Sequence, residues 1–475
     1  MKKNFTSLAA FMLLALCSLN LKAQHEQQNY YPPTDTLVIH KLAQWQDMKF
    51  GLLMHWGTYS EWGIVESWSL CPEDEDWCKR QGAFAGDYFK YRTAYENLKT
   101  TFNPTRFNPD RWAATAQKAG MRYVVVTAKH HDGFCMFDTK LTDYKITDAA
   151  CPFSANAKAN VINEVFKSFR AKGFMTGAYF SKPDWHCPWY WDPYFPPYDR
   201  NPNYDNSKYP EKWEKFKAFT SGQIKELMTG YGHVDILWLD GGWVQPYTTT
   251  SPRWGKTPCN QDIDMNSIVK MARGLQPGLI VVDRAVEGPN QNYLTPEQQV
   301  PDKPLPYPWE TCMTMATSWS YVPHDTYKPA RVLIQTLCTI VSRGGNLLLN
   351  VGPGPDGEWD SVAYERLDEI GAWMHVNSGA IYGTKPVAPY QSGNIVFTAK
   401  ADTVYAIYLA GETETTMPAT ITIKNFSPKT GAKAMMPGTT KALAWKTENG
   451  NTLVSIPAAL RKKPPTNYAW VVRFF

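Results

Sequence analysis

Residues 234–242 read Val-Asp-Ile-Leu-Trp-Leu-Asp-Gly-Gly, and this stretch does most to decide the fold of the 475-residue chain. Its nearly continuous apolar run is typical of a strand that is buried on both faces of a parallel sheet. The carboxylate of Asp240 ends the run, and the two glycines that follow permit a sharp turn and leave room for a ligand. An aspartate at a strand end can also cap the next helix, so the stretch alone allows either a functional or a structural Asp240.

Five other apolar runs resemble this one, and helical patterns lie between them. The further predicted strands are Phe50–Trp56, Tyr123–Thr127, Phe174–Phe180, Leu279–Val282 and Leu347–Val351. The predicted helices are Pro109–Lys118, with Asn108 placed to cap it, Ala159–Ala171, Glu211–Met228 and Ser361–Val376. This alternation predicts βα units around a mainly parallel sheet, which is an α/β fold.

The polar residues at the strand ends favour a closed barrel over an open sheet. At or just past the C-terminal ends of four different predicted strands lie His55, His130, His131, Asp240 and Arg284. In a (β/α)8 barrel those ends converge on one mouth, where the chemistry takes place. We therefore predict a (β/α)8-like catalytic barrel over residues 24–386, with two strands still to be found between residues 284 and 347.

The pattern changes after Pro386. Short runs rich in β-branched and aromatic residues follow, and turn residues rather than helical patterns separate them. These runs are Asn394–Lys400, Thr403–Leu409, Ala419–Lys424, Thr452–Ile456 and Tyr468–Phe474. We predict that residues 387–475 form a small C-terminal antiparallel β-sandwich.

The first 23 residues have the pattern of a secretory signal peptide. Lys2 and Lys3 precede an apolar run from Leu8 to Cys17, and cleavage after Ala23 fits the sequence. We therefore predict a periplasmic or secreted protein. Because no later stretch reaches about 18 consecutive apolar residues, no membrane span is expected.

Export would permit disulfide bonds among the later cysteines. Cys71 and Cys78 flank an acidic loop and could close it, whereas Cys338 lies in an apolar helical pattern and is expected to be a buried thiol. The chain has no Cys-x-x-Cys pair, so a structural zinc site is not expected.

The composition narrows the class of partner. The net charge of +5 is too small to indicate nucleic acid binding. Aromatic residues make up 14% of the chain, and aromatic faces pack well on the C–H faces of sugars, although they also build protein cores.

Two further strings carry candidate chemistry. His130 and His131, followed by Asp132, could ligate a metal ion, but neighbouring strand residues point to opposite faces, and no His-Glu-x-x-His pattern occurs. Hydrogen bonding to substrate hydroxyls is therefore the favoured interpretation. In Thr295-Pro296-Glu297, the carboxyl of Glu297 follows a stiff proline, but on spacing alone it is no better a candidate than Glu287, Asp302 or Glu310.

Taken in order, the strings along residues 40–385 resemble glycoside hydrolase family 29, the retaining α-L-fucosidases. The matching segments are Phe50–Ser60, Ala128–Phe134, Ala178–Ser181, Pro183–His186, Asp235–Gly241, Thr295–Glu297, Pro308–Cys312, Ser318–Tyr321, Gly344–Gly357 and Ala380–Thr384. Each segment is weak alone, whereas the ordered set is specific. The resemblance implies an irregular barrel followed by a β-sandwich, in agreement with the pattern analysis.

By this resemblance Asp240 matches the catalytic nucleophile and Glu297 matches the general acid/base. The residues implied to hold the fucose hydroxyls or to shape the pocket are His55, Glu66, Trp68, His130, His131, Tyr179, Trp238 and Arg284, with Trp319 on the methyl side of the sugar. The chain departs from the family pattern twice. Ser67 is inserted between Glu66 and Trp68, and Ser320 stands where a glycine is usual.

The implied activity is exo-hydrolysis of terminal α-L-fucose from fucosylated oligosaccharides or glycoconjugates by double displacement. This chemistry requires no metal and no cofactor. The alternatives are another retaining exo-glycosidase, a glycan-binding protein without turnover, and a metal-dependent hydrolase that uses His130, His131 and Asp132. The linkage that is cleaved, the oligomeric state and the disulfide pairing are left open at this stage.

Overall fold

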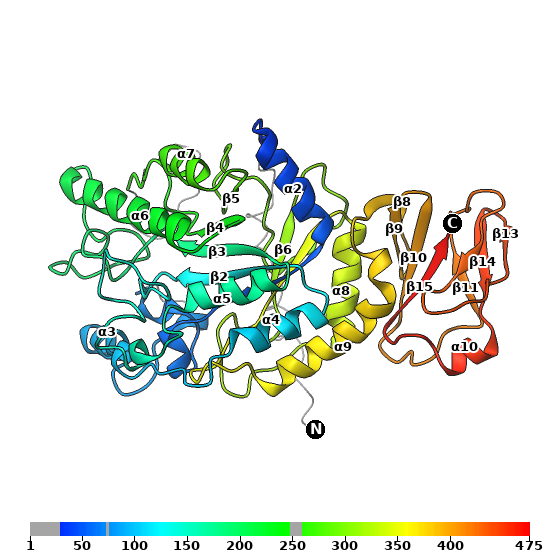
Figure 1. Ribbon diagram of the computed structural model, residues 1–475, viewed down its shortest axis with the longest axis horizontal. Helices are drawn as coiled ribbons and strands as arrows, with labels where there is room; N and C mark the ends of the chain where they lie inside the picture. Colours follow the sequence, from blue (N-terminus) through cyan, green and yellow to red (C-terminus); the bar gives the residue numbers. More distant parts are fainter. Residues whose placement is uncertain (1–28, 73–75, 248–258) are drawn as a thin grey trace, which may run out of the picture.

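The computed structural model describes residues 29–72, 76–247 and 259–475, so the predicted signal peptide lies outside the described residues. Seven parallel strands form one curled sheet in the order β5-β4-β3-β2-β1-β7-β6 (Figure 1). The strands are β1 (Phe50–Met54), β2 (Tyr123–Lys129), β3 (Met175–Ser181), β4 (Ile236–Asp240), β5 (Ile280–Asp283), β6 (Glu310–Thr314) and β7 (Asn346–Asn350). All six strands predicted from the apolar runs are present, and β6 is one of the two that were missing.

The gap between the edge strands β5 and β6 is bridged by residues 290–298, which we call the seam segment. Isolated bridges join Gln291 to Val282 of β5 and Glu297 to Cys312 of β6. The backbone N–H of Gln298 donates to the carbonyl of Cys312 at 2.9 Å. The barrel is therefore completed by an irregular segment in the place where a regular eighth strand was expected.

Side chains fill the interior of the barrel with the two-residue period of the strands. Ile236 and Trp238 of β4 point inward, whereas Leu237 and Leu239 pack in the cluster between the sheet and the helices. The ring of Tyr123 crosses the interior, and a Cβ on Gly51 would lie 2.4 Å from it, which explains the glycine within β1.

Helices cover the outside of the barrel (Figure 1). They are α2 (Thr36–Met48), α3 (Tyr88–Glu96), α4 (Pro109–Lys118), α5 (Val161–Ala171), α6 (Pro210–Gly230), α7 (Met265–Leu275), α8 (Ala330–Ser342) and α9 (Ser361–Asn377). The cap predicted for α4 is confirmed, because the side chain of Asn108 accepts a hydrogen bond from the Arg111 N–H. Trp45 of α2 covers the amino-terminal end of the barrel, where its ring stacks on Tyr293 at 4.0 Å.

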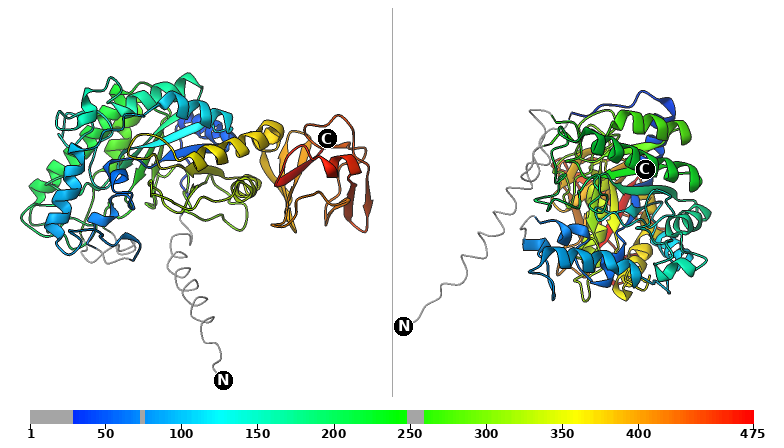
Figure 2. Two further views of the ribbon diagram at one scale, coloured as in Figure 1. Left: turned by 90° about the horizontal axis from the view of Figure 1, so that it is seen from below. Right: turned by 90° about the vertical axis from the view of Figure 1, so that its left-hand side faces the viewer.

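Two antiparallel sheets follow the barrel and lie beside α8 at one end of the long axis (Figures 1 and 2). One sheet has the order β12-β15-β10-β9-β8 and the other β11-β14-β13. Their bounds are β8 (Lys385–Ser392), β9 (Ile395–Lys400), β10 (Thr403–Leu409), β11 (Thr420–Ile423), β12 (Ala434–Met435), β13 (Trp445–Glu448), β14 (Asn451–Ser455) and β15 (Ala469–Phe474), with the short helix α10 (Ala458–Lys462). Phe397, Ile421 and Trp470 belong to one buried cluster between the sheets, as a sandwich requires.

Three predictions drawn from the cysteine positions and the apolar runs concern the described part of the chain. Cys338 is fully buried in α8, as predicted. Cys71 and Cys78 are both buried, but part of the loop between them, residues 73–75, lies outside the described residues, so its closure by a disulfide stays a prediction. Among the helices of the described ranges, none combines the length and the apolar character that crossing a bilayer demands.

Candidate active site

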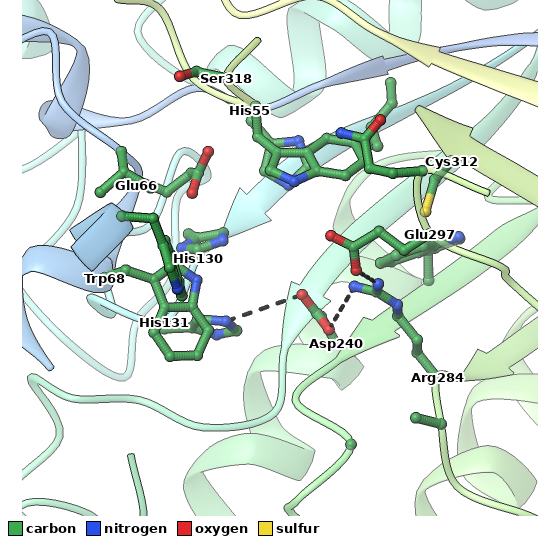
Figure 3. A pocket seen from close by; sticks show the side chains of 18 of the residues that line it. His55, Glu66, Trp68, His130, His131, Asp240, Arg284, Glu297, Cys312 and Ser318 are labelled. Atoms are coloured by element: carbon green, nitrogen blue, oxygen red, sulfur yellow. Dashed lines mark hydrogen bonds and ion pairs between the residues drawn. The ribbon is translucent and has the colours of Figure 1, made fainter. Parts of the chain in front are cut away.

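A cavity of about 550 Å³ opens at the carboxyl ends of the barrel strands. The predicted site residues that line it are His55, Glu66, Trp68, His130, His131, Trp238, Asp240, Arg284, Glu297 and Trp319 (Figure 3). The remaining predicted residue, Tyr179, lies just behind these lining residues, and its hydroxyl donates a hydrogen bond to Asp240. The five residues of the strand-end pattern, His55, His130, His131, Asp240 and Arg284, thus converge on one cavity as predicted, and the residues named by resemblance lie with them.

Asp240 is the last residue of β4, and hydrogen-bond donors surround its carboxylate. The hydroxyl of Tyr179 donates to Oδ2 at 2.6 Å, and the N–H of Gly241 donates to Oδ1 at 2.8 Å. The Arg284 guanidinium lies 3.2 Å from Oδ1. The sharp turn predicted for the two glycines is confirmed, since Gly241 has a φ of +89° and a Cβ there would lie 2.3 Å from Pro183.

The environment keeps Asp240 ionised. Burial is the largest single influence and raises the pKa of this carboxyl group, but the groups that favour the ionised form, with the positive charge of Arg284 first and the hydrogen bonds from the Tyr179 hydroxyl and the Gly241 N–H after it, together outweigh burial. The net effect holds the pKa of Asp240 well below its ordinary value. A carboxylate that is charged at every physiological pH, and that faces a cavity, is suited to act as a nucleophile.

Glu297 lies in the seam segment and faces Asp240 across the cavity (Figure 3). Its carboxylate pairs with the second terminal nitrogen of Arg284, whose first nitrogen contacts Asp240. One guanidinium therefore contacts both carboxyl groups. The side chain of Glu297 is 30% exposed, whereas that of Asp240 is 16% exposed, so Glu297 has the easier exchange with solvent.

The protonated nitrogen of His55 can be deduced from its neighbours. The amide nitrogen of Asn350 donates to the carbonyl of Trp319 at 2.6 Å, so the amide oxygen of Asn350 must face His55. That oxygen lies 2.8 Å from Nδ1, which therefore carries the hydrogen. Nε2 of His55 is left as an acceptor for a ligand hydroxyl.

His130 and His131 both face the cavity, although strand alternation predicted opposite directions. The alternation does not apply because both residues lie past the end of β2, whose pairing with β3 is already irregular between Thr127 and Lys129. Serine hydroxyls hold both rings at Nδ1, Ser67 for His130 at 2.5 Å and Ser181 for His131 at 2.7 Å. Each ring can therefore turn its Nε2 toward a ligand.

All three histidines of the cavity are held neutral. Burial lowers the pKa of His55 to about 4 and that of His131 to about 3, and it lowers the pKa of His130 well below the ordinary value. A neutral imidazole offers one donor and one acceptor, which suits the hydroxyl groups of a sugar better than it suits an anion.

The same region could be mistaken for a metal site. Ligand atoms of His130, His131 and Asp240 lie within 4.8 Å of one another. However, the Asp240 oxygens already accept hydrogen bonds, and the guanidinium of Arg284 places a positive charge beside them, which disfavours a second cation. Asp132, the ligand considered from the sequence, is not part of this group and accepts a hydrogen bond from the buried Tyr95 hydroxyl instead.

Known proteins resemble this chain in sequence and in fold. The family model described as Alpha-L-fucosidase matches residues 17–379. The chain belongs to the alpha-L-fucosidase family. An alpha-L-fucosidase from Branchiostoma floridae is 29% identical over 96% of this chain and 98% of its own length, and the human tissue alpha-L-fucosidase is 26% identical over 98% and 96%. The solved structure of alpha-L-fucosidase isoenzyme 1 from Paenibacillus thiaminolyticus is 29% identical, with a TM-score of 0.73, and it covers 92% of this chain and 99% of that one.

The two residues that depart from the alpha-L-fucosidase pattern, Ser67 and Ser320, each contact a residue that lines the cavity. The N–H of Ser320 donates to the buried carboxyl of Glu66 at 2.9 Å, and its hydroxyl donates to the carbonyl of Ile64 at 2.7 Å. The inserted Ser67 contacts His130. Burial raises the pKa of Glu66 to about 7, with the Ser320 N–H opposing the rise, so this carboxyl can donate or accept near neutral pH. Both departures therefore help to hold side chains that line the cavity.

Sequence reasoning missed several residues that line this cavity. The larger ones are Trp77, Arg200 and Trp243. Trp243 directly follows the Gly-Gly pair after Asp240, and that position was a usable signal. Trp77 lies in the short 3-10 helix Asp76–Cys78, and Arg200 lies in the loop between β3 and α6. No local sequence pattern predicts that these two loops meet at the cavity.

Proposed function

We propose that this protein removes terminal α-L-fucose from fucosylated oligosaccharides or glycoconjugates by a retaining double displacement. The observation that carries the proposal is the pairing of Asp240 and Glu297 in one cavity, with a single arginine touching both. Membership of the alpha-L-fucosidase family supports the choice of sugar. A secretory signal peptide at residues 1–23 is part of the proposal, and it implies action in the periplasm or outside the cell.

In the first step Asp240 attacks the anomeric carbon of the fucose. The bond between that carbon and the glycosidic oxygen breaks, and protonated Glu297 gives its proton to the departing oxygen. The products are a fucosyl ester on Asp240 and a free hydroxyl on the leaving sugar. The low pKa of Asp240 supports its role as nucleophile, since the attacking carboxylate must be ionised.

In the second step Glu297 acts as a base. It takes a proton from water, the oxygen of that water attacks the anomeric carbon, and the ester bond to Asp240 breaks. Free fucose leaves with its original anomeric configuration, Asp240 is again a carboxylate, and Glu297 is again protonated. The partial exposure of Glu297 suits a group that must meet water in each cycle.

The bridging arginine suits the movement of charge in this cycle. The negative charge lies on Asp240 in the free enzyme and on Glu297 in the ester intermediate. Because the Arg284 fork contacts both carboxylates, its positive charge lies next to the negative charge in either state. No large rearrangement is then needed between the two steps.

The remaining lining residues fit a deoxyhexose. Neutral His55, His130 and His131, together with Glu66, supply hydrogen-bonding groups for the three free hydroxyls. The indole rings of Trp68 and Trp319 supply apolar surface, and Trp319 is assigned to the methyl group of the sugar.

The test is Asp240→Gly, assayed on an activated aryl α-L-fucoside. We expect loss of turnover with an unchanged circular dichroism spectrum, and partial rescue by azide, which fills the space of the missing carboxylate. Wild-type activity in this variant would remove Asp240 from the mechanism. Methanolysis checks the stereochemistry, and methyl β-L-fucoside as the first product would rule out retention.

A further inference from the structure

The cavity contains more residues than the fucose site uses. Those without a role so far include Trp77, Arg200, Trp243, Thr317 and Ser318. Trp77 is 55% exposed, and Thr317 is exposed as well, so both lie at the mouth of the cavity. A terminal fucose occupies the catalytic end, so the rest of the glycan must extend toward these residues.

Three indole rings form one side of the route to solvent, and we call Trp68, Trp77 and Trp243 the aromatic wall. The ring of Trp68 packs edge-on against His131 at 5.2 Å, and Nε2 of His131 lies 4.0 Å from Asp240. Trp77 then packs on Trp68 at 5.3 Å. The wall is therefore continuous from the neighbourhood of Asp240 to the mouth.

The base of the wall is held in place before any ligand binds. Nε1 of Trp243 donates to the hydroxyl of buried Tyr190 at 3.1 Å, and that hydroxyl donates to Gln261 at 2.8 Å. The guanidinium of Arg200 lies over Trp68 at 4.8 Å and over Trp243 at 5.2 Å. A surface fixed in this way loses little conformational entropy on binding.

Another part of the cavity lining is polar. The N–H groups of Thr317 and Ser318 both donate to the carboxylate of Asp325, at 3.2 and 3.1 Å, and this turn presents Ser318 at the top of the cavity (Figure 3). The lining thus combines aromatic rings with the hydroxyl of Ser318 and that of Thr317, which itself donates to Asp325 and is left as an acceptor. A pyranose ring has the matching shape, with an apolar C–H face and hydroxyls at its edge.

We propose that the mouth is the binding site for the sugar to which the fucose is attached, a neutral pyranose whose C–H face packs on Trp77. Its edge hydroxyls face Thr317 and Ser318. This inference rests on the proposed fucosidase activity, because it assigns the leaving-group side of the same reaction. Trp77 then contributes to the choice among fucosylated glycans without touching the fucose.

The experiment compares two substrates that share the fucose and differ in the leaving group. α-L-Fucosyl fluoride has no leaving sugar, whereas a fucosylated trisaccharide has one. Trp77→Ala is expected to lower kcat/KM for the trisaccharide about ten-fold more than for the fluoride, with the loss mainly in KM. Trp77→Phe should restore most of the loss, since it keeps an aromatic face.

Phe89→Ala is the matched control, because Phe89 is 59% exposed and does not line the cavity. It should leave both substrates unaffected. Equal losses on the fluoride and the trisaccharide in Trp77→Ala, or no loss on either, would overturn the inference while leaving the proposed function intact. A wild-type protein that cleaves neither substrate would instead overturn both.

Discussion

Replacing Arg284 with methionine removes the cation that contacts both Asp240 and Glu297 and keeps a side chain of similar length. The guanidinium lies 3.2 Å from Asp240, and both side chains are only about 15% exposed. For charges about 4 Å apart in such a setting, an effective dielectric constant of about 20 gives an interaction of about 4 kcal/mol. Since one pKa unit corresponds to about 1.36 kcal/mol, the pKa of Asp240 should rise by about three units in the variant.

The sign of this change can be read in a pH profile. Asp240 must be ionised to attack, so the acidic limb of kcat/KM follows its pKa. In the wild type that limb lies at very low pH, because the pKa of Asp240 is held well below its ordinary value. In Arg284→Met we expect the limb to move up by about three pH units into a readily measured range. At pH 7, kcat/KM should fall by about 10² to 10³, as for other removed charge-stabilising donors.

Arg284→Lys is the matched control for this experiment. It keeps the positive charge but cannot bridge two carboxylates as a planar fork does. We therefore expect its acidic limb to stay low while kcat falls. An Arg284→Met variant whose acidic limb matches that of the wild type, with a loss confined to KM, would refute the reasoning and leave Arg284 as a sugar-binding residue only.

Three other outcomes follow from the site. Glu297→Ala should reduce kcat far more for substrates with poor leaving groups than for activated aryl fucosides. Glu287 is an exposed glutamate in the same loop, and Glu287→Ala should leave kcat unchanged for both kinds of substrate. Equal losses for both kinds of substrate in Glu297→Ala would show that another residue is the general acid. Burial raises the pKa of Glu310 from 4.5 to about 7. The contribution of protonated Glu310 to the free energy of unfolding is therefore complete below pH 4.5 and is lost as the pH rises through 7. The free energy of unfolding in urea should therefore fall between pH 5 and 8 in the wild type, and in Glu310→Gln this fall should be smaller by up to about 3 kcal/mol. An unchanged pH dependence in the variant would contradict this assignment. Dialysis against a chelator should leave turnover unchanged, because Arg284 disfavours a cation at Asp240; loss of turnover restored by added metal would revive the metal-dependent alternative.

The regular part of the barrel could be predicted because its strands are apolar on both faces. The strand β6 was missed for the opposite reason. It reads Glu-Thr-Cys-Met-Thr, and its polar side chains find partners in other segments: Tyr123 donates to Glu310 at 2.6 Å inside the barrel, and Thr311 donates to the carbonyl of Gln299 at 2.7 Å. Partners this distant in sequence leave no local pattern.

The candidate site also contains residues that the sequence pattern reveals and residues that it does not. Asp240 could be found because a carboxylate that ends an apolar strand is conspicuous. Glu297 could not be distinguished from Glu287 or Glu310 by spacing, and the resemblance to the family was needed to select it. The aromatic side of the mouth was missed because Trp77 and Arg200 come from loops that meet only in the folded chain.

The seam segment has a consequence for how such a catalytic pair can change. Asp240 is held by hydrogen-bonded strands on both sides of β4, so an insertion or deletion near it would disturb the whole sheet. Glu297 lies in a segment that is held by only a few isolated bridges, where a change in chain length disturbs little of the sheet. Proteins that evolve from this fold can therefore shift or replace the proton donor at position 297 while the nucleophile at position 240 keeps its place. The same change can be attempted by mutagenesis.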